Sequence, residues 1–183
     1  MLADALVPLV AVGLAELGDK TQLSILLLSS KTRKHAQLLL GVMLAFLIVD
    51  GVAVLAGAWV IGVVPAGFLK TISGIVFIVF GALMLRGDGG ATEAKSYSQN
   101  PFSSGFLLVF MTEWGDKTQI ASGVLATEYN ALMVLIGTMT ALAVLSATAI
   151  YLGKTVLNKI DKKVMAKAAG IAFTLMGASM ILL

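Results

Sequence analysis

Long apolar stretches separated by short polar turns run through the whole chain. A helix that crosses a bilayer needs roughly 20 predominantly apolar residues. Six stretches reach about that length: 4–29, 37–62, 67–85, 103–126, 131–153 and 164–183. Together they take up nearly the whole sequence and leave no room for an extramembrane domain. The pattern therefore predicts an all-α, multi-pass integral membrane protein with six transmembrane helices in the lipid bilayer.

A short polar motif inside the first stretch recurs inside the fourth. Glu16–Leu23 reads ELGDKTQL and Glu113–Ile120 reads EWGDKTQI, at an offset of 97 residues. Further positions recur at an offset of 96, namely the pairs Gly41 and Gly137, Gly57 and Gly153, Gly74 and Gly170, Phe77 and Phe173, and Gly81 and Gly177. Each half then contains three helices, and an odd number of crossings places the second half upside down in the membrane.

This repeat predicts the domain organisation of the chain. We expect a first three-helix repeat over residues 1–86, a polar linker over 87–102, and a second, inverted three-helix repeat over 103–183. Inverted repeats of this kind are typical of secondary transporters, whose substrate sites lie near the middle of the bilayer where the repeats meet.

Each copy of the motif places two acids inside an apolar helix near the middle of the membrane. Inverted symmetry should bring Glu16, Asp19, Glu113 and Asp116 around one point, and these four acids are our predicted metal site. On a continuous helix, residues three positions apart share a face, which adds an amide from each copy. The amides are Gln22 and Gln119.

The remaining polar residues of the motifs leave alternatives open. Gly18 and Gly115 allow either the close approach of a facing helix or a local break that frees backbone carbonyls. The hydroxyls of Thr21 and Thr118 could bind an ion, although we favour a hydrogen bond back to a helical carbonyl.

Three further ionisable residues are expected to support the site or couple it to protons. Lys20 and Lys117 either tune the acids and replace the cation in the empty state, or pair structurally with Asp116 and Asp19 of the opposite repeat. Asp50, in the second helix, has Ser146 as its counterpart. It is either an additional proton site or a polar group bonded to a neighbouring helix.

The charge of the motifs indicates what the site binds. Four acids and two lysines leave a charge of −2, and an unbalanced buried charge costs several kcal/mol. One divalent cation or two protons would neutralise it, so the same carboxylates could exchange metal for protons. The chain has no Cys and one His, and oxygen ligands suit Ca²⁺, Mn²⁺ or Mg²⁺ rather than Zn²⁺ or Cu⁺.

Composition narrows the function and predicts the orientation. The net charge is +3, but nine of the basic residues occupy short turns that alternate with almost uncharged ones. Basic turns stay in the cytoplasm, so both termini should lie outside it, and no nucleic-acid partner is expected. The sequence has no nucleophile–base pattern, phosphate loop or metalloprotease motif. We therefore expect a transporter rather than an enzyme, without a cofactor.

The duplicated Glu-x-Gly-Asp-Lys-Thr motif resembles the signature of the Gdt-type cation/proton antiporters, a family of Golgi, plastid and prokaryotic membrane proteins. The resemblance covers essentially the full length, and both motif copies are intact. It implies an exporter of Mn²⁺ and/or Ca²⁺ from the cytosol in exchange for protons. The short linker lacks the extensions of organellar relatives, so we expect the protein in a prokaryotic cell membrane. A divalent-cation channel and an exporter of small organic cations are the alternatives.

Overall fold

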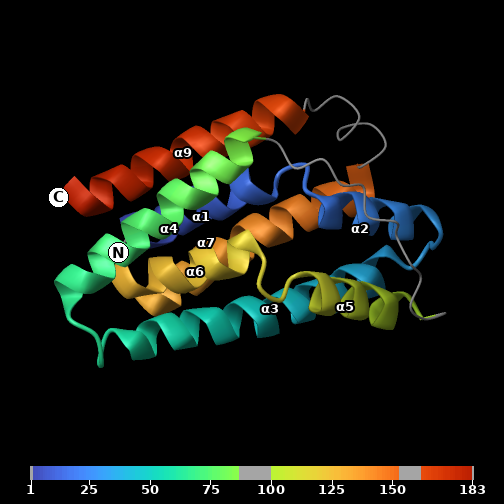
Figure 1. Cartoon of the computed structure of the whole chain (residues 1–183). Helices are drawn as coiled ribbons and strands as arrows, with labels where there is room; N and C mark the ends of the chain where they lie inside the picture. Colours follow the sequence, from blue (N-terminus) through green and yellow to red (C-terminus); the bar gives the residue numbers. More distant parts are fainter. Residues whose placement is uncertain (1, 87–99, 153–161, 183) are drawn as a thin grey trace.

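The protein is described here by a computed structural model that covers residues 2–86, 100–152 and 162–182, in which every regular element is a helix (Figure 1). The elements are α1 (Leu2–Glu16), α2 (Lys20–Ser30), α3 (His35–Val60), α4 (Ala66–Arg86), α5 (Pro101–Thr112), α6 (Lys117–Glu128), α7 (Ala131–Ala147), the π-helix η1 (Thr148–Leu152) and α9 (Lys162–Leu182). The prediction of an all-α chain is confirmed.

Three of the described helices are long and apolar enough to cross a membrane, judged by length and composition. They are His35–Val60, Gly67–Arg86 and Ala131–Leu152, while Pro101–Thr112 and Ala166–Leu182 are shorter apolar helices. Large apolar side chains point outward from this bundle, such as Leu55 at 70% and Leu175 at 66% exposure. An exposed apolar surface of this kind is what a lipid-facing protein presents.

The first and fourth apolar stretches are not the continuous helices that their composition predicts. The first is divided into α1 and α2, and the fourth into α5 and α6, with the polar motif at each division. At the division the backbone of Gly18 and Gly115 takes positive φ angles of 80° and 76°. A left-handed residue ends an α-helix, which settles the alternative between close approach and local break in favour of the break.

The helices lie side by side in an elongated bundle. Helix α4 packs against α9, α1 against α7, and α3 against α5, α6 and α7. Both chain termini and the turn between α3 and α4 lie at one end of the bundle, whereas the turn between α2 and α3 lies at the other (Figure 1). The two motifs are held between these ends.

Contacts between the halves pair residues that occupy the same place in each repeat. Phe77 of α4 packs edge-to-face on Phe173 of α9, its own counterpart, with ring centroids 5.1 Å apart. On either side of this pair the helices approach so closely that a Cβ would meet backbone of the opposite helix. A Cβ on Gly81 would meet the carbonyl of Gly170, and one on Gly177 would meet that of Gly74.

The same exchange relates the packing of α3 on α5 to that of α7 on α1. A Cβ on Gly41 would meet the carbonyl of Phe102, and a Cβ on Gly137 would meet the carbonyl of Ala5. Small residues at these positions let helix backbones approach each other inside a membrane protein.

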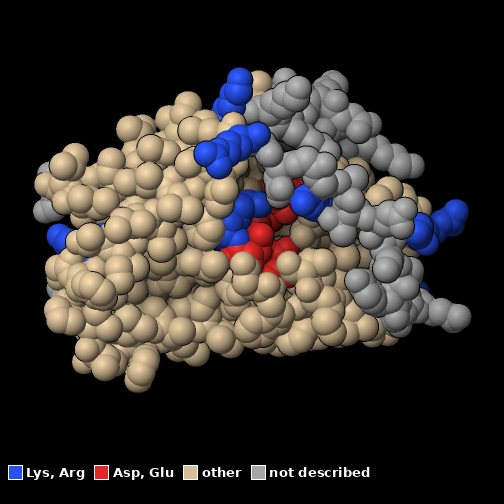
Figure 2. Space-filling view, in the orientation of Figure 1, with Lys and Arg blue, Asp and Glu red and all other residues tan. Residues whose placement is uncertain are grey.

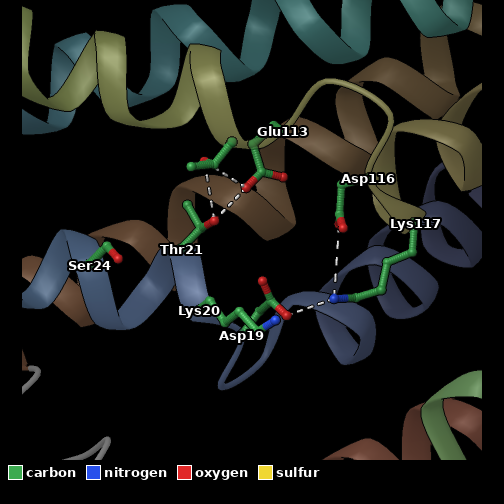
Figure 3. A pocket seen from close by; sticks show the side chains of 8 residues that line it. Asp19, Lys20, Thr21, Ser24, Glu113, Asp116 and Lys117 are labelled. Carbon is green, nitrogen blue, oxygen red and sulfur yellow. Dashed lines mark hydrogen bonds and ion pairs between the residues drawn. The ribbon is translucent and has the colours of Figure 1, made fainter. Parts of the chain in front are cut away.

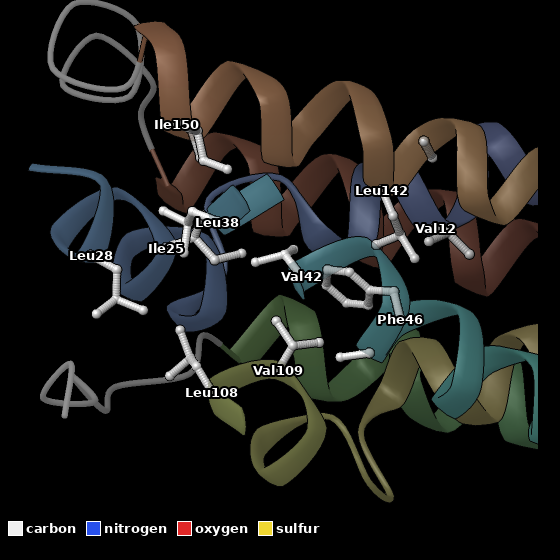
Figure 4. Packing of buried hydrophobic residues seen from close by; sticks show 13 residues of the cluster. Val12, Ile25, Leu28, Leu38, Val42, Phe46, Leu108, Val109, Leu142 and Ile150 are labelled. Atoms are coloured by element: carbon white, nitrogen blue, oxygen red, sulfur yellow. The ribbon is translucent and has the colours of Figure 1, made fainter. Parts of the chain in front are cut away.

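The buried apolar side chains join both halves into one packed body. One cluster combines Val12, Ile25 and Phe46 of the first half with Leu108 and Leu142 of the second (Figure 4). A second cluster surrounds Phe77 and Phe173. The motif residues are thus held by packing from both halves.

Part of the predicted polar connections lies outside the described residues. This applies to positions 87–99 of the predicted linker over 87–102, and to the basic residues Lys95, Lys154 and Lys159. The last residues of that linker already belong to the second half, because α5 begins at Pro101 and Asn100 caps it by accepting a hydrogen bond from the N–H of Phe102 (3.0 Å).

Candidate metal site at the two helix breaks

The chain turns at the glycine of each motif, and a glutamine of the same motif holds the turn. The N–H of Gly18 donates to Oε1 of Gln22 (3.0 Å), and the N–H of Gly115 donates to Oε1 of Gln119 (2.6 Å). No atom lies within 4 Å of the place that a Cβ on Gly115 would occupy. The positive φ rather than lack of space therefore requires glycine there.

These breaks change the role predicted for the glutamines. Because the helix does not continue through the motif, the acids and the amide do not share one helical face, and that part of the prediction is wrong. The amide oxygens are used to hold the breaks. Gln22 and Gln119, predicted as supporting residues on the same helical face as the acids, therefore shape the site by holding its turns.

Three of the four predicted acids converge. One carboxylate oxygen from each of Glu16, Glu113 and Asp116 lies within 4.8 Å of the other two. Glu16 is 1% and Glu113 3% exposed. The three come from both repeats, since Glu16 ends α1 while the other two lie in the break between α5 and α6.

The fourth acid is drawn aside by an ion pair between the repeats. Asp19 accepts a hydrogen bond from Nζ of Lys117 at 2.6 Å, and the same Nζ lies 3.9 Å from Oδ2 of Asp116 (Figure 3). This is one of the cross-repeat pairs that the structural interpretation of the lysines predicts. Lys117 thus places a positive charge between an acid of the converging group and Asp19.

The threonines of the motifs bond across the repeats, not back along their own helices as we favoured. Thr21 Oγ1 donates to Oε1 of Glu113 (2.5 Å), and Thr118 Oγ1 donates to Oε1 of Glu16 (3.0 Å). Thr118 Oγ1 also lies 3.2 Å from Oδ2 of Asp116. Both threonines are the second residue of a helix, where no preceding turn offers a carbonyl. Each hydroxyl therefore holds a buried glutamate of the opposite repeat.

A cavity of about 260 Å³ opens beside the converging acids. Its walls are Asp19, Lys20, Thr21, Ser24, Thr112, Glu113, Asp116 and Lys117 (Figure 3). The space-filling view shows acidic atoms in a hollow with basic atoms beside them, on a face that is otherwise mostly uncharged (Figure 2). The cavity joins residues of α2 to residues at the end of α5, so it lies between the repeats.

Two of the lining residues, Ser24 and Thr112, lie outside the motif and were not predicted. Ser24 is 1% exposed and follows Thr21 by three positions, which places both on one face of α2. Thr112 immediately precedes Glu113, and its Oγ1 lies 3.5 Å from Oγ1 of Thr21. A search for small polar residues at helical spacing from the motif would have found Ser24.

Asp50 lies apart from the converging acids, on α3. It is 3% exposed and accepts a hydrogen bond from Oγ of Ser122 on α6 (3.0 Å). Oγ of Ser122 in turn lies 3.4 Å from Oγ1 of Thr138 on α7. Sequence analysis did not identify these two partners. The bond to a neighbouring helix is the one that the structural interpretation of Asp50 predicts.

The two repeats differ most clearly at their glutamines. Nε2 of Gln119 donates to the carbonyl of Val49 (3.1 Å), which ties α6 to α3. Nε2 of Gln22 is buried and has no hydrogen-bond partner among the described residues. The amide of Gln119 therefore ties α6 to α3, whereas the corresponding amide of α2 makes no such contact among the described residues.

The converging oxygens define what the site can bind. Glu16, Glu113 and Asp116 offer carboxylate oxygens only, and hydroxyls of Thr21 and Thr118 support them. Hard divalent cations prefer such ligands. Without a cation, the two buried glutamates and the partly exposed Asp116 would repel each other, and protons would relieve that repulsion.

Comparison with known proteins identifies relatives over the whole length. A family model described as the divalent cation/proton antiporter GDT1 matches residues 4–92 and 101–183. A Vibrio cholerae protein named "Putative manganese exporter" is 32% identical over 172 residues, which is 93% of this chain and 86% of that protein. The rice protein GDT1-like protein 5 is 26% identical over 204 residues, 90% of this chain and 88% of that protein. No solved structure matches the chain at a significant level.

Proposed function

Because the chain belongs to the GDT1 family of divalent cation/proton antiporters, we propose that it exports Mn²⁺ and/or Ca²⁺ from the cytosol in exchange for protons. The observation that carries the proposal is the approach of Glu16, Glu113 and Asp116 to within 4.8 Å at two helix breaks. A multi-pass antiporter of this family is a transporter and not an enzyme.

The ligand chemistry supports a hard cation as the substrate. Carboxylate and hydroxyl oxygens surround the proposed site, and the chain has no Cys to offer a soft ligand. Mn²⁺ and Ca²⁺ both accept such ligands. The name of the Vibrio cholerae relative, "Putative manganese exporter", supports Mn²⁺ as the first cation to test.

The charge balance supports exchange with protons. The four motif acids and the two motif lysines sum to −2 when all are ionised. One divalent cation brings this sum to zero, and so do two protons. A binding site inside the apolar interior of the membrane is most stable when its net charge is zero. The carrier then moves in one direction with metal and returns with protons, which is antiport.

We also propose that the chain crosses the membrane six times as two inverted repeats. The contacts between the halves support this proposal. If each residue of a contact is replaced by its counterpart in the other repeat, the result is another contact of the structure. The bond from Thr21 to Glu113 becomes the bond from Thr118 to Glu16 under this exchange. A twofold axis in the membrane plane produces such pairs.

The proposed orientation places both termini outside the cytoplasm of a prokaryotic cell. The termini lie at the end of the bundle opposite the turn between α2 and α3 (Figure 1). That turn contains Lys31, Arg33 and Lys34, and basic turns stay on the cytoplasmic side. Helix α2 leads from the proposed site to this turn, so the cavity beside α2 would face the cytosol.

Two alternatives use the same acids. A divalent-cation channel needs a path on both sides of the site, but Gln119 and Ser122 tie α6 to α3 on one side. An exporter of small organic cations needs an apolar wall against the cation's carbon atoms. The cavity is instead lined by charged and hydroxyl-bearing residues, which favours a metal ion.

Purified protein in liposomes tests the proposal. An imposed pH gradient should drive Mn²⁺ uptake with counter-movement of protons, and Asp116→Asn should abolish both because it removes charge while it preserves shape. Asp19→Asn should also abolish uptake, since it removes the nearer of the two carboxylates that pair with Lys117. Lys70→Ala, on the exposed side of α4, is the control and should transport normally. Normal Mn²⁺ and Ca²⁺ flux in both Asn variants would refute the site, and electrogenic flux without protons would indicate a channel.

A further inference from the structure

Asp50 is a buried acid that the proposed metal site does not use. Its side chain comes from α3 and is 3% exposed. The hydrogen bond that it accepts comes from Ser122, which is itself fully buried on α6. Among the described residues, no lysine or arginine forms an ion pair with it.

A carboxylate in these surroundings is stable in its neutral form. A hydroxyl supplies one hydrogen bond but no charge, and an isolated ionised carboxylate in an apolar interior is costly. Asp50 is also close to the break that holds Glu113 and Asp116. The carbonyl of the preceding residue, Val49, accepts a hydrogen bond from Nε2 of Gln119 (3.1 Å), and Oε1 of Gln119 accepts one from the N–H of Gly115 (2.6 Å). This proximity makes the charge on Asp50 sensitive to the charge of those acids.

The remaining ionisable groups on the elements that pack against α3 do not offset that charge. Helix α5 and helix α7 contain none. Lys117 at the start of α6 is paired with Asp19 at 2.6 Å. The others are Glu128, at the far end of α6, and Tyr151 in η1. Asp50 therefore responds mainly to the converging acids across the helix break.

We propose that Asp50 is a proton-binding site outside the metal cluster, protonated when the cluster is free of metal and deprotonated when a divalent cation is bound. The inference rests on the proposed antiport function and assigns one of its two protons to Asp50, so that the metal-free motifs hold one proton and a net charge of −1. A divalent cation among Glu16, Glu113 and Asp116 displaces that proton and brings the charge of the motifs to zero. That change favours the ionised form of Asp50, so the proton on its carboxyl oxygen leaves as metal arrives.

The second repeat has no acid at the position that corresponds to Asp50. The counterpart of Asp50 is Ser146 on α7, which is 2% exposed and carries no charge. Because only the first repeat has this acid, metal binding to the shared cluster releases a proton from this position in the first repeat and none from the corresponding position in the second. Asp50 is thus a coupling site, whereas the acids of the motifs bind the ion.

Calorimetric titration of the purified protein with Mn²⁺ measures this coupling directly. The titration is repeated at one pH in buffers of different ionisation enthalpy, which gives the number of protons released per Mn²⁺. Asp50→Ser places in α3 the residue that the other repeat carries, and it should still bind Mn²⁺ while releasing up to about one proton fewer than the wild type. Ser146→Ala is the matched control and should release the wild-type number.

The possible results separate the inference from the proposed function. If the wild type binds Mn²⁺ without releasing protons, the antiport proposal fails. If the wild type releases protons and Asp50→Ser releases the same number, the role of Asp50 is refuted while antiport stands. A lower release that is also seen in Ser146→Ala would refute it too, because the effect would not be specific to the acid.

A second measurement keeps the inference testable if variants of Asp50 do not fold. Infrared difference spectra of the wild type, with and without Mn²⁺, should lose the carbonyl band of a protonated carboxylic acid. Ser122→Ala removes the hydrogen bond to Asp50 and should shift that band. A band that is unchanged in Ser122→Ala would show that the proton lies elsewhere and would overturn the proposal.

Discussion

The left-handed turn at Gly115 predicts a specific cost for a single added methyl group. Its φ is 76°, and no atom lies within 4 Å of the place that a Cβ would take. Gly115→Ala therefore introduces no clash, and its cost is that of holding an L-residue in this conformation, about 1–2 kcal/mol. Alanine also favours a continuous helix more than glycine does, so this second effect destabilises the broken conformation as well.

The broken conformation is the one that brings Glu113 and Asp116 to Glu16. If only this conformation binds metal, a cost of about 1–2 kcal/mol weakens Mn²⁺ binding about 5- to 30-fold. Equilibrium titration of the purified variant with Mn²⁺ measures this loss. The maximal amount of Mn²⁺ bound should not change, because all of the acids remain.

Gly51→Ala is the matched control for that experiment. Gly51 is in the interior of α3, has an ordinary helical φ, and also has no atom within 4 Å of an added Cβ. The same methyl group should leave Mn²⁺ affinity unchanged there and should raise thermal stability slightly. Wild-type affinity in Gly115→Ala, or an equal loss in Gly51→Ala, would refute the reasoning that the left-handed turn builds the site.

Two further predictions concern the cavity and the threonines. The chain has no Cys, so Ser24→Cys should react with a membrane-impermeant thiol reagent from the cytoplasmic side, while Ala121→Cys at the equivalent buried position of α6 should not. Equal labelling of both would contradict a cavity whose wall includes Ser24 and not Ala121. Thr118→Val removes the hydroxyl that donates to buried Glu16 and should lower the free energy of unfolding by about 1.5–3 kcal/mol, with Thr118→Ser near wild type. Thermal denaturation in detergent measures this change, and an unaltered Thr118→Val would mean that the bond contributes nothing.

The convergence of the acids could be predicted from sequence because it depends on symmetry. Two copies of one motif at matched positions, in halves of three helices each, are expected to meet, and Glu16 does meet Glu113 and Asp116. The position of Asp19 could not be derived in this way. It depends on which lysine reaches which acid, and the distance of 2.6 Å to Lys117 is a property of the packed structure.

The helix breaks were less predictable, because an apolar stretch carries the same pattern whether its helix is continuous or divided. Gly18 and Gly115 permitted both arrangements, and only the backbone angles distinguish them. The hydrogen-bond partners of the threonines could not be predicted for the same reason. A bond back to a carbonyl was expected on the assumption of a preceding helical turn, and the break removes that turn from Thr21 and Thr118.

The contact of Phe77 with Phe173, its own counterpart, has a consequence for how the two halves can diverge. If two identical half-length chains associated about a twofold axis, every substitution would appear in both copies. Joining the halves in one polypeptide removes that restriction, and each half can then acquire a residue that the other lacks. An acid at position 50 opposite a serine at position 146 is a combination that two identical half-length copies cannot encode.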